Sequence, residues 1–334
     1  MRHRVIASST GNRISRRRRW VYLAPLVAVF LFLVIGPPFL DTAIISQLTK
    51  ILCFGLLAMS LDVAFGYTGL WSFGHAGIFG VAAYTTMLFF KYTAIHNFWI
   101  ITPVAILMAA IVAAVFAAVA ARSSGLYFLL ITLALGQLVY CVAVQWKPVT
   151  NGDDGLWGLP YPQLGFPFSN ISYYYFTLAV VALCAFLLYR FTRSPFGYSL
   201  VGIRENEVRA RTMGYNTRLR KLIAFVISGS FAGLAGILYV YFNGGIAPEN
   251  VGMYASGMAM IMVIIGGTAT LWGGFVGSAV VLLSQYYISQ LTPARWPIFL
   301  GALFIAAGFF AGGGIFPRLA CLWKKAVLYG DAES

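Results

Sequence analysis

The chain consists of long apolar stretches separated by short polar or glycine-rich segments. About 20 apolar residues cross the hydrocarbon core of a bilayer as a helix, whereas a membrane β-barrel shows short segments of alternating hydrophobicity. We interpret ten stretches as spans, near residues 20–40, 43–65, 70–90, 98–121, 124–146, 171–191, 221–243, 253–268, 273–291 and 296–312. The pattern predicts an all-α, polytopic membrane protein with about ten transmembrane helices.

The composition excludes other protein classes. Of the 334 residues, 60% are hydrophobic and 10% are charged, whereas soluble domains carry about 25% charged residues. Soluble enzymes, disordered chains and collagen-like chains are therefore excluded. The four cysteines form no C-x-x-C pair, which argues against a disulfide scaffold.

The positions of the charges predict the topology. The net charge is +14, from 23 Lys and Arg residues and 9 Asp and Glu residues. Cytoplasmic loops of membrane proteins carry an excess of Lys and Arg. Ten spans place both termini on one side, and if that side is the cytoplasm, the outer side keeps just Lys50, Lys91, Lys147 and Arg295. We therefore expect cytoplasmic termini and no nucleic-acid partner.

The remaining segments are too short to form a second domain. We expect a basic cytoplasmic arm at 1–19, one membrane domain at 20–318 and a cytoplasmic tail at 319–334. The membrane domain includes an outer loop, 147–170, and a charged inner segment, 192–220. The pair Arg16-Arg17 loosely resembles a twin-arginine signal, but the apolar run 20–40 is longer than a cleaved signal core, so we expect it to be retained.

Motifs for catalysis and cofactors are missing from the sequence. No lysine follows a glycine, so a Walker A loop for ATP is excluded, and the histidines and cysteines lack metal-ligand spacing. Ser72 and His75 share a helical face, as a Ser/His hydrolase would require, but no third group that would orient the histidine is evident. We expect a protein that is not an enzyme and has no cofactor.

A glycine-rich segment at 61–77 contains the one carboxylate that falls inside a predicted span, Asp62. A charge at membrane depth normally faces protein or water, and glycines permit irregular backbone there. One interpretation is an element of a translocation path or gate, and the other is a tight inner turn between packed spans. The candidate residues are Asp62, Gly66, Gly69, Ser72 and His75.

A second glycine-rich inner turn spans 266–277 and shares a Leu-Trp pair with Leu70-Trp71. Interrupted apolar segments at comparable places in two halves of a chain can mark a transport site. Gly266, Gly267 and Trp272 are therefore further candidates for the path or gate.

The inner segment predicts one short amphipathic helix. Pro195 suits its start, Gly214 suits the position after its end, and Glu205 and Arg209 have the spacing of an i,i+4 ion pair. Such a helix lies on a lipid interface or docks in a groove of a soluble partner. The sequence pattern leaves both alternatives open.

The outer loop carries two adjacent acidic residues, Asp153 and Asp154, between glycines. The spacing of a calcium-binding EF-hand loop is missing. Docking or gating and an ordinary capped turn remain as interpretations.

Six collinear segments resemble one family, the permease subunits of branched-chain amino acid ABC importers. They are LDVAFGYTGLWSFGHAGIFGVAAYT (61–85), GLYFLLITLALGQL (125–138), TNGDDGL (150–156), RSPFGYSLVGIRENEVRARTMGYN (193–216), KLIAFVISGSFAGLAGILY (221–239) and GGTATLWGGFVGSA (266–279). The resemblance covers roughly 45–318 and is to the LivH/LivM family, with LivM more similar than LivH. The tail 312–319 resembles the closing FxPRGL of the family with altered glycines.

The resemblance implies a multi-subunit importer in a bacterial inner membrane. Its expected partners are a second, LivH-like permease, two cytoplasmic ABC ATPases and a periplasmic binding protein for branched-chain amino acids. It also implies an ATPase-coupling helix that contains Gly202, Ile203, Arg204, Glu205, Asn206, Glu207, Arg209, Ala210, Met213 and Gly214. We expect Asp153 and Asp154 to contribute to binding-protein docking or gating.

Two alternative functions remain. Importers of urea and short amides share the permease family, so the substrate class stays open. A stand-alone ion-coupled transporter or channel is the other alternative, but it would place more ionisable groups along its path than this chain provides.

Overall fold

The computed structural model describes residues 33–93, 97–120, 123, 125–162, 168–291, 297–299, 301–302, 305 and 313–318. The contacts divide the chain into one unit of residues 1–41 and 318–334 and a second unit of residues 42–317. In the first unit, the described part contains the short helix η1 (Pro37–Phe39). The second unit holds all the other elements and every candidate site residue.

The described residues of the second unit are almost entirely helical, which confirms the predicted fold class. The helices are α2 (Thr42–Asp62), η2 (Val63–Tyr67), α3 (His75–Tyr92), α4 (Phe98–Ala120), α5 (Leu126–Gln145), α6 (Lys147–Thr150), η3 (Gly152–Asp154), α7 (Asn170–Thr192), α8 (Pro195–Glu205), α9 (Glu207–Thr212), α10 (Thr217–Asn243), η4 (Pro248–Asn250), α11 (Met253–Gly266) and α12 (Gly273–Leu291). Two short strands, β1 (Leu156–Trp157) and β2 (Gly245–Ile246), pair in antiparallel fashion.

Six described stretches are long and apolar enough to cross a membrane, in agreement with a polytopic membrane protein. They are Thr42–Tyr67, Phe98–Ala120, Leu126–Gln145, Asn170–Thr192, Thr217–Asn243 and Pro248–Gly266. Helices α3 and α12 coincide with two further predicted spans, although α3 begins at His75 because residues 68–74 form a turn. The predicted spans 20–40 and 296–312 lie mostly outside the described residues.

Helix α10 packs against α2, α3 and α4, and small residues determine how closely it approaches them. Ala105, Ala109 and Ala113 of α4 are fully buried at every fourth position. Ala113 and Ala109 face Gly229 and Gly233 of α10, where an added methyl group would overlap them. Stripes of small residues allow the close helix packing that stabilises membrane bundles.

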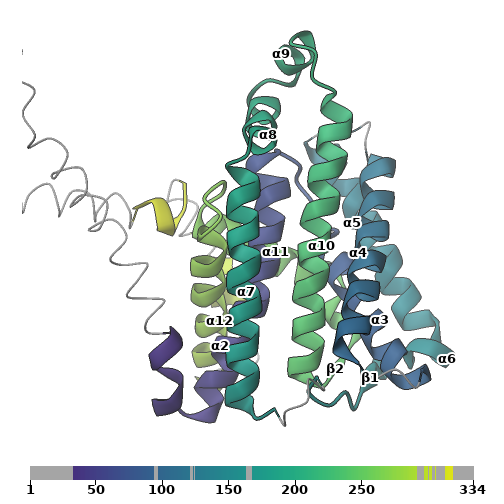
Figure 1. The fold of residues 1–334 in the computed structure, drawn as a ribbon, viewed down its shortest axis with the longest axis vertical. Coiled ribbons are helices and arrows are strands. Elements are labelled where there is room, and N and C mark those ends of the chain that lie inside the picture. The colour runs from purple at the N-terminus through teal and green to yellow at the C-terminus, as the bar shows by residue number, and fades with distance from the viewer. Residues whose placement is uncertain are drawn as a thin grey trace, which may run out of the picture. The chain divides into compact units, whose positions relative to one another are not determined.

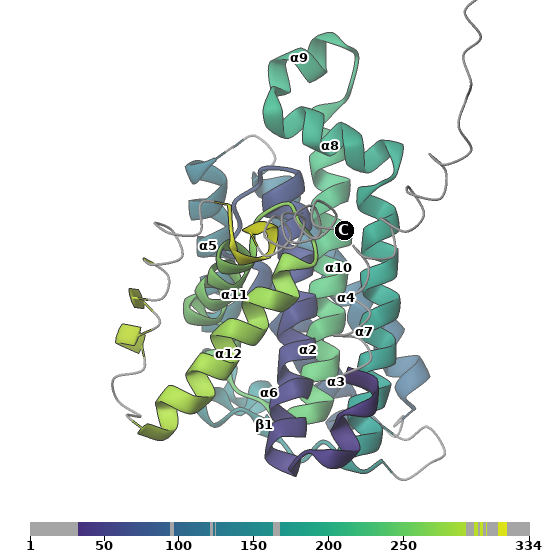
Figure 2. The same ribbon diagram turned by 90° about the vertical axis from the view of Figure 1, so that its left-hand side faces the viewer.

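The long helices place the connecting segments at two opposite ends of the bundle. Figure 1 shows α8 and α9 at one end and α6, β1 and β2 at the other, and Figure 2 shows the same separation after a quarter turn. Among the described cationic residues, Arg204, Arg209 and Arg211 lie at the α8–α9 end, and Lys147 lies at the β1–β2 end. This separation matches the predicted inner and outer loops, and the orientation in the membrane remains a prediction.

Candidate functional site

The carboxylate of Asp62 joins the two glycine-rich turns. Asp62 ends α2 and is 1% exposed. Its Oδ1 accepts a hydrogen bond from the Ala269 N–H at 2.8 Å, and its Oδ2 accepts one from the Leu271 N–H at 3.0 Å. The two segments selected from the sequence therefore form one junction, although about 200 residues separate them.

The loop 267–272 has a conformation that depends on this carboxylate. Ala269 and Leu271 adopt left-handed φ values of 59° and 54°, which cost roughly 1–2 kcal/mol for each non-glycine residue. Backbone N–H groups that converge in such a loop bind anions, and hydrogen bonds to a carboxylate are stronger than neutral ones. Within the loop, the Thr270 hydroxyl donates to the Gly267 carbonyl at 2.5 Å. Asp62 therefore stabilises a backbone conformation that Ala269 and Leu271, as non-glycine residues, disfavour.

Glycines occupy the closest approaches around this junction. A methyl group at Gly66 would overlap Oδ1 of Asp62 and the backbone nitrogen of Ala269. A methyl group at Gly267 would lie 2.8 Å from the Gly313 carbonyl oxygen and 2.8 Å from Cδ of Pro317. Gly266 likewise lies directly against the backbone of Gly273.

The turn after η2 contacts the charged segment 192–220 at Arg204, near the end of α8. Gly69 adopts a φ of 75°, and a methyl group there would lie 2.9 Å from Cγ of Arg204. Nη1 of Arg204 donates to the Gly66 carbonyl. The predicted coupling segment and the predicted gate segment are thus in direct contact, which sequence reasoning missed.

His75 is fully buried, and both of its ring nitrogens have hydroxyl partners. Nδ1 lies 3.0 Å from Oγ of Ser72, and Nε2 lies 2.8 Å from Oγ of Ser228. The Ser228 hydroxyl donates to the Ser60 carbonyl, so it accepts from Nε2–H, and Nδ1 accepts from Ser72. A neutral imidazole between two hydroxyl groups connects α2, α3 and α10, and it lacks the orienting carboxylate of a hydrolytic triad.

The Leu-Trp pairs of the two turns are placed alike. Leu70 and Leu271 are both 2% exposed. Trp71 is exposed and packs against the ring of Phe65, while Trp272 is half-buried and packs against Phe275. In both turns the leucine is buried and the tryptophan is more exposed than the leucine.

The prediction of one helix across the inner segment, with a Glu205–Arg209 ion pair, is wrong. Asn206 has an extended backbone, ends α8 and caps α9, with its Oδ1 accepting from the Arg209 N–H at 2.9 Å. The break separates Glu205 from Arg209, because i,i+4 neighbours meet only on a continuous helix. Glu205 pairs instead with Arg204 at 2.6 Å.

The predicted ends of this segment are confirmed. Pro195 opens α8 behind Ser194, whose side chain accepts from the Gly197 N–H. Gly214 has a φ of 86°, its N–H donates to the Arg211 carbonyl, and the Tyr215 N–H donates to the Ala210 carbonyl. This paired arrangement is the glycine-dependent end of a helix known as the Schellman motif.

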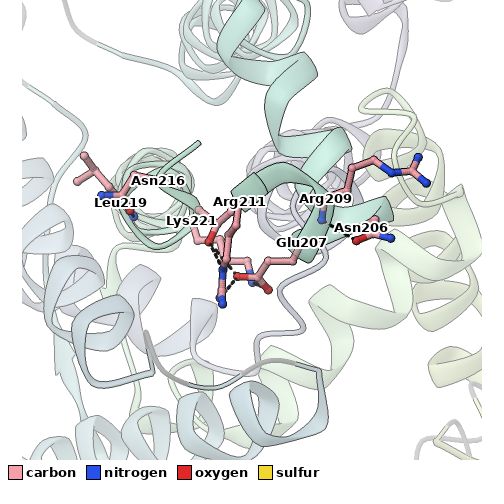
Figure 3. A network of polar contacts seen from close by, with 8 residues as sticks. Asn206, Glu207, Arg209, Arg211, Asn216, Leu219 and Lys221 are labelled. Atoms are coloured by element: carbon pink, nitrogen blue, oxygen red, sulfur yellow. Dashed lines mark hydrogen bonds and ion pairs between the residues drawn. The ribbon is translucent and has the colours of Figure 1, made fainter. Parts of the chain in front are cut away.

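Glu207 fastens α9 to the start of α10 (Figure 3). Its Oε1 accepts from Arg211 Nη2 at 2.7 Å and from the Thr217 hydroxyl at 3.0 Å, and its Oε2 accepts from Lys221 Nζ at 2.6 Å. Partial burial by itself would raise the pKa of Glu207, but the hydrogen bonds from Lys221 and Arg211 lower it below its ordinary value. The Glu207–Arg211 spacing is visible in the sequence, whereas the contact with Lys221 needs the fold.

The residues predicted to couple to an ATPase divide into buried and exposed ones. Ile203 in α8 and Ala210 in α9 are buried, at 2% and 6% exposed. Gly202, Arg204, Glu205, Asn206, Arg209, Met213 and Gly214 are exposed, and Glu207 is half-buried. We call Val208, Arg209 and Met213 the tip surface; the side chain of Arg209 points away from the Glu207 cluster (Figure 3).

At the opposite end, Asp153 and Asp154 are exposed on a fixed turn. The Asp154 carbonyl accepts from Nε1 of Trp157 at 2.7 Å, and the next residues form β1 against β2. Within the described residues no group of three or more His, Cys, Asp or Glu side chains could hold a metal ion. The two exposed carboxylates thus lie on a turn that leads directly into the β1–β2 pair.

Comparison with known proteins gives the family. The description "Branched-chain amino acid transport system / permease component" matches residues 43–308. The LivM high-affinity branched-chain amino acid transport system permease proteins of Escherichia coli K12 and Salmonella typhimurium are 26% and 25% identical over 317 residues, covering 87% of this chain and 74% of each relative. The autoinducer 2 import system permease protein LsrC of Salmonella paratyphi B is 28% identical over 188 residues, or 52% of this chain and 51% of its own length.

No solved structure matches the chain. The family match covers most of the sequence and includes both glycine-rich turns and the α8–α9 segment. The chain is a multi-pass membrane protein, and it belongs to the family of branched-chain amino acid transport system permease components.

Proposed function

We propose that this chain is the transmembrane permease subunit of an ATP-driven importer for branched-chain amino acids in a bacterial inner membrane. It would act with a second permease subunit, two cytoplasmic ABC ATPases and a periplasmic binding protein. The observation that carries the proposal is the α8–α9 segment, which extends beyond the long helices (Figure 1) and is bonded to α10 through Glu207. The names of the LivM relatives support the substrate class.

The tip surface supports docking to a soluble protein. Val208 and Met213 are 71% and 69% exposed, and Arg209 lies beside them. In Figure 1, α9 is the element farthest from the long helices. Exposed apolar side chains beside a cation suit a protein groove. Since no lysine follows a glycine in this chain, energy from ATP would come from such a partner.

The junction around Asp62 supports a role as the frame of an inner gate. Gly66, Gly69, Ser72, His75, Gly266, Gly267 and Trp272 belong to the same two turns and the adjoining start of α3. The carboxylate of Asp62 and the ring of His75 already bind groups of this chain. We therefore propose that these residues hold the turns in place and that the substrate is bound by others.

The turn that carries Asp153 and Asp154 supports docking of a binding protein at the β1–β2 end. Both side chains are exposed, and the backbone beneath them is fixed by β1 and β2. A preformed acidic surface would steer a partner with a basic rim.

The test of the proposed function is charge reversal at the tip. Arg209 has no ion pair within the described part of the chain, so Arg209→Glu should leave the fold intact. Losing one partner of a docked charge contact costs about 2–5 kcal/mol. We expect uptake and ATPase co-purification to fall while the amount of protein in the membrane stays normal.

The matched control is Arg218→Glu, since Arg218 is also exposed but lies at the start of α10, outside the tip surface. Competition with leucine, urea and short amides separates the substrate alternatives. Normal uptake and normal ATPase recovery in Arg209→Glu would contradict the proposal, and uptake that follows an ion gradient would favour a stand-alone transporter.

A further inference from the structure

Arg204 connects the end of α8 to η2, which directly follows α2. Its Nη1 donates to the Gly66 carbonyl, and its Nε and Nη2 donate to Oε1 of Glu205 at 3.2 and 2.6 Å. The side chain is 33% exposed. A planar guanidinium with several donors can hold a backbone carbonyl and a carboxylate at once in a fixed geometry.

The Gly66 carbonyl lies immediately beside the Asp62 junction. After Tyr67 the chain leaves the helix, with the N–H groups of Gly69 and Leu70 bonded to Phe65 and Ala64 rather than to Gly66. On its other side Gly66 is so close to Asp62 and Ala269 that even a methyl group would overlap them. A shift of the Gly66 backbone toward Asp62 and Ala269 therefore has to displace one or both of them.

The loop 267–272 is a suitable element to respond to such a shift. Its left-handed residues, Ala269 and Leu271, are held by the two oxygens of Asp62. Strained backbone of this kind persists only while its surroundings hold it. Movement of the carboxylate would release it, and Gly267 would carry the change to Gly313 and Pro317.

We infer that Arg204 is a positioning residue that transmits displacement of the α8–α9 segment to the loop 267–272, through the Gly66 carbonyl and Asp62. The inference rests on the proposed function, because the displacing force would come from a protein docked on the tip surface. It separates two tasks within one segment: the tip surface binds the partner, and Arg204 passes its movement to the bundle.

The experiment uses Arg204→Gln and Arg204→Lys in the full transporter complex, with Arg218→Gln as the matched control. ATP hydrolysis is measured with and without loaded binding protein, together with uptake and ATPase co-purification. For Arg204→Gln we expect stimulation and uptake, each expressed relative to the ATPase that co-purifies and to its basal hydrolysis, to fall by about tenfold. Arg204→Lys should recover part of this loss, since it keeps a charged donor without the planar fork. Arg218→Gln should behave like the unaltered chain.

A second measurement needs no partner. Amide hydrogen exchange at Ala269 and Leu271 is recorded in the purified full chain, and exchange in α4 and α10 reports whether the bundle has folded. We expect faster exchange at these two amides in Arg204→Gln and unchanged exchange in Arg218→Gln. Unchanged exchange at Ala269 and Leu271 in a folded Arg204→Gln protein, or full stimulation of its ATPase, would overturn the inference.

The two proposals fail differently. If Arg209→Glu keeps normal uptake and ATPase recovery, the proposed docking at the tip is wrong, whatever the exchange data show. If Arg209→Glu loses the ATPase while Arg204→Gln shows normal exchange and normal stimulation, docking stands and the transmission role of Arg204 is wrong.

Discussion

Two carboxylates organise the α8–α9 end of this permease, and they have different kinds of partner. Asp62, 1% exposed, binds two backbone N–H groups of the loop 267–272. Glu207, whose side chain is 26% exposed, binds Arg211, Lys221 and the Thr217 hydroxyl. The buried carboxylate is stabilised by backbone N–H groups in a fixed geometry. The carboxylate closer to water is stabilised by the flexible, charged side chains of Arg211 and Lys221.

The difference predicts different sensitivities. Hydrogen bonds buried in the bundle are screened little by salt, while partly exposed ion pairs are weakened by it. Removing a buried acceptor leaves donors without partners, and removing an exposed one lets water replace it. Asp62 should therefore be necessary for the loop, and Glu207 should adjust how firmly α9 is held.

The largest effect should come from Asp62→Ala, which leaves the N–H groups of Ala269 and Leu271 without an acceptor. The expected loss is roughly 1–3 kcal/mol for each unpaired group, measured as thermal unfolding of the purified chain. Asp62→Asn keeps one carbonyl oxygen and should lose less stability. For Asp62→Asn we expect uptake to fall more than the amount of folded protein; a parallel fall in both would show that the junction is structural and not part of a gate.

An intermediate effect is expected from Gly66→Ala, because its methyl group would overlap Asp62 and Ala269. Overpacking at such a contact costs roughly 1–3 kcal/mol. The matched control is Gly202→Ala in α8, where nothing lies within 4 Å of the added methyl and helix propensity favours alanine. Thermal unfolding of both variants tests this. Equal stability of the two variants would mean that the junction can relax around the methyl group.

Several features of the α8–α9 end of the bundle could be predicted from the sequence, because short local patterns indicate them. A carboxylate inside an apolar stretch identified Asp62, and helix-end chemistry identified Pro195 and Gly214. Each signal lies within a few residues of the feature it predicts. The same locality applies to the segment 192–220, where the structure forms α8 and α9.

The remaining features could not be predicted. Some depend on contacts between residues far apart in the sequence, and one depends on a small energy difference between two backbone conformations of the same residue. Asp62 binds backbone groups of Ala269 and Leu271, and a backbone N–H leaves no mark in the sequence. The contact between Arg204 and the Gly66 carbonyl could not be predicted either, because a backbone carbonyl also leaves no mark in the sequence. The break at Asn206 was missed because asparagine can continue a helix or cap the next one, and the tertiary contacts of α9 favour the cap.

The smallest effect should come from Glu207→Gln, read as amide exchange within α9. Partly exposed ion pairs contribute about 0.2–1 kcal/mol each, so α9 should loosen without unfolding the bundle. The control is Glu205→Gln, because Glu205 pairs with Arg204 and does not contact Lys221; it should leave exchange in α9 unchanged.

The pH and salt dependence of this effect follow from the charge of Glu207. Its pKa in the folded chain is lowered by Lys221 and Arg211 against the opposing effect of burial, so the stabilisation is fully present above the ordinary glutamate pKa and is lost as the pH falls through the lowered value. The difference between the unaltered chain and Glu207→Gln should be constant near neutral pH and should shrink below about pH 4. High salt should shrink it as well. A difference that persists at low pH and in high salt would show that Glu207 holds α9 through the shape and neutral hydrogen bonds of its side chain, and the contrast with Asp62 would then be one of position rather than of charge.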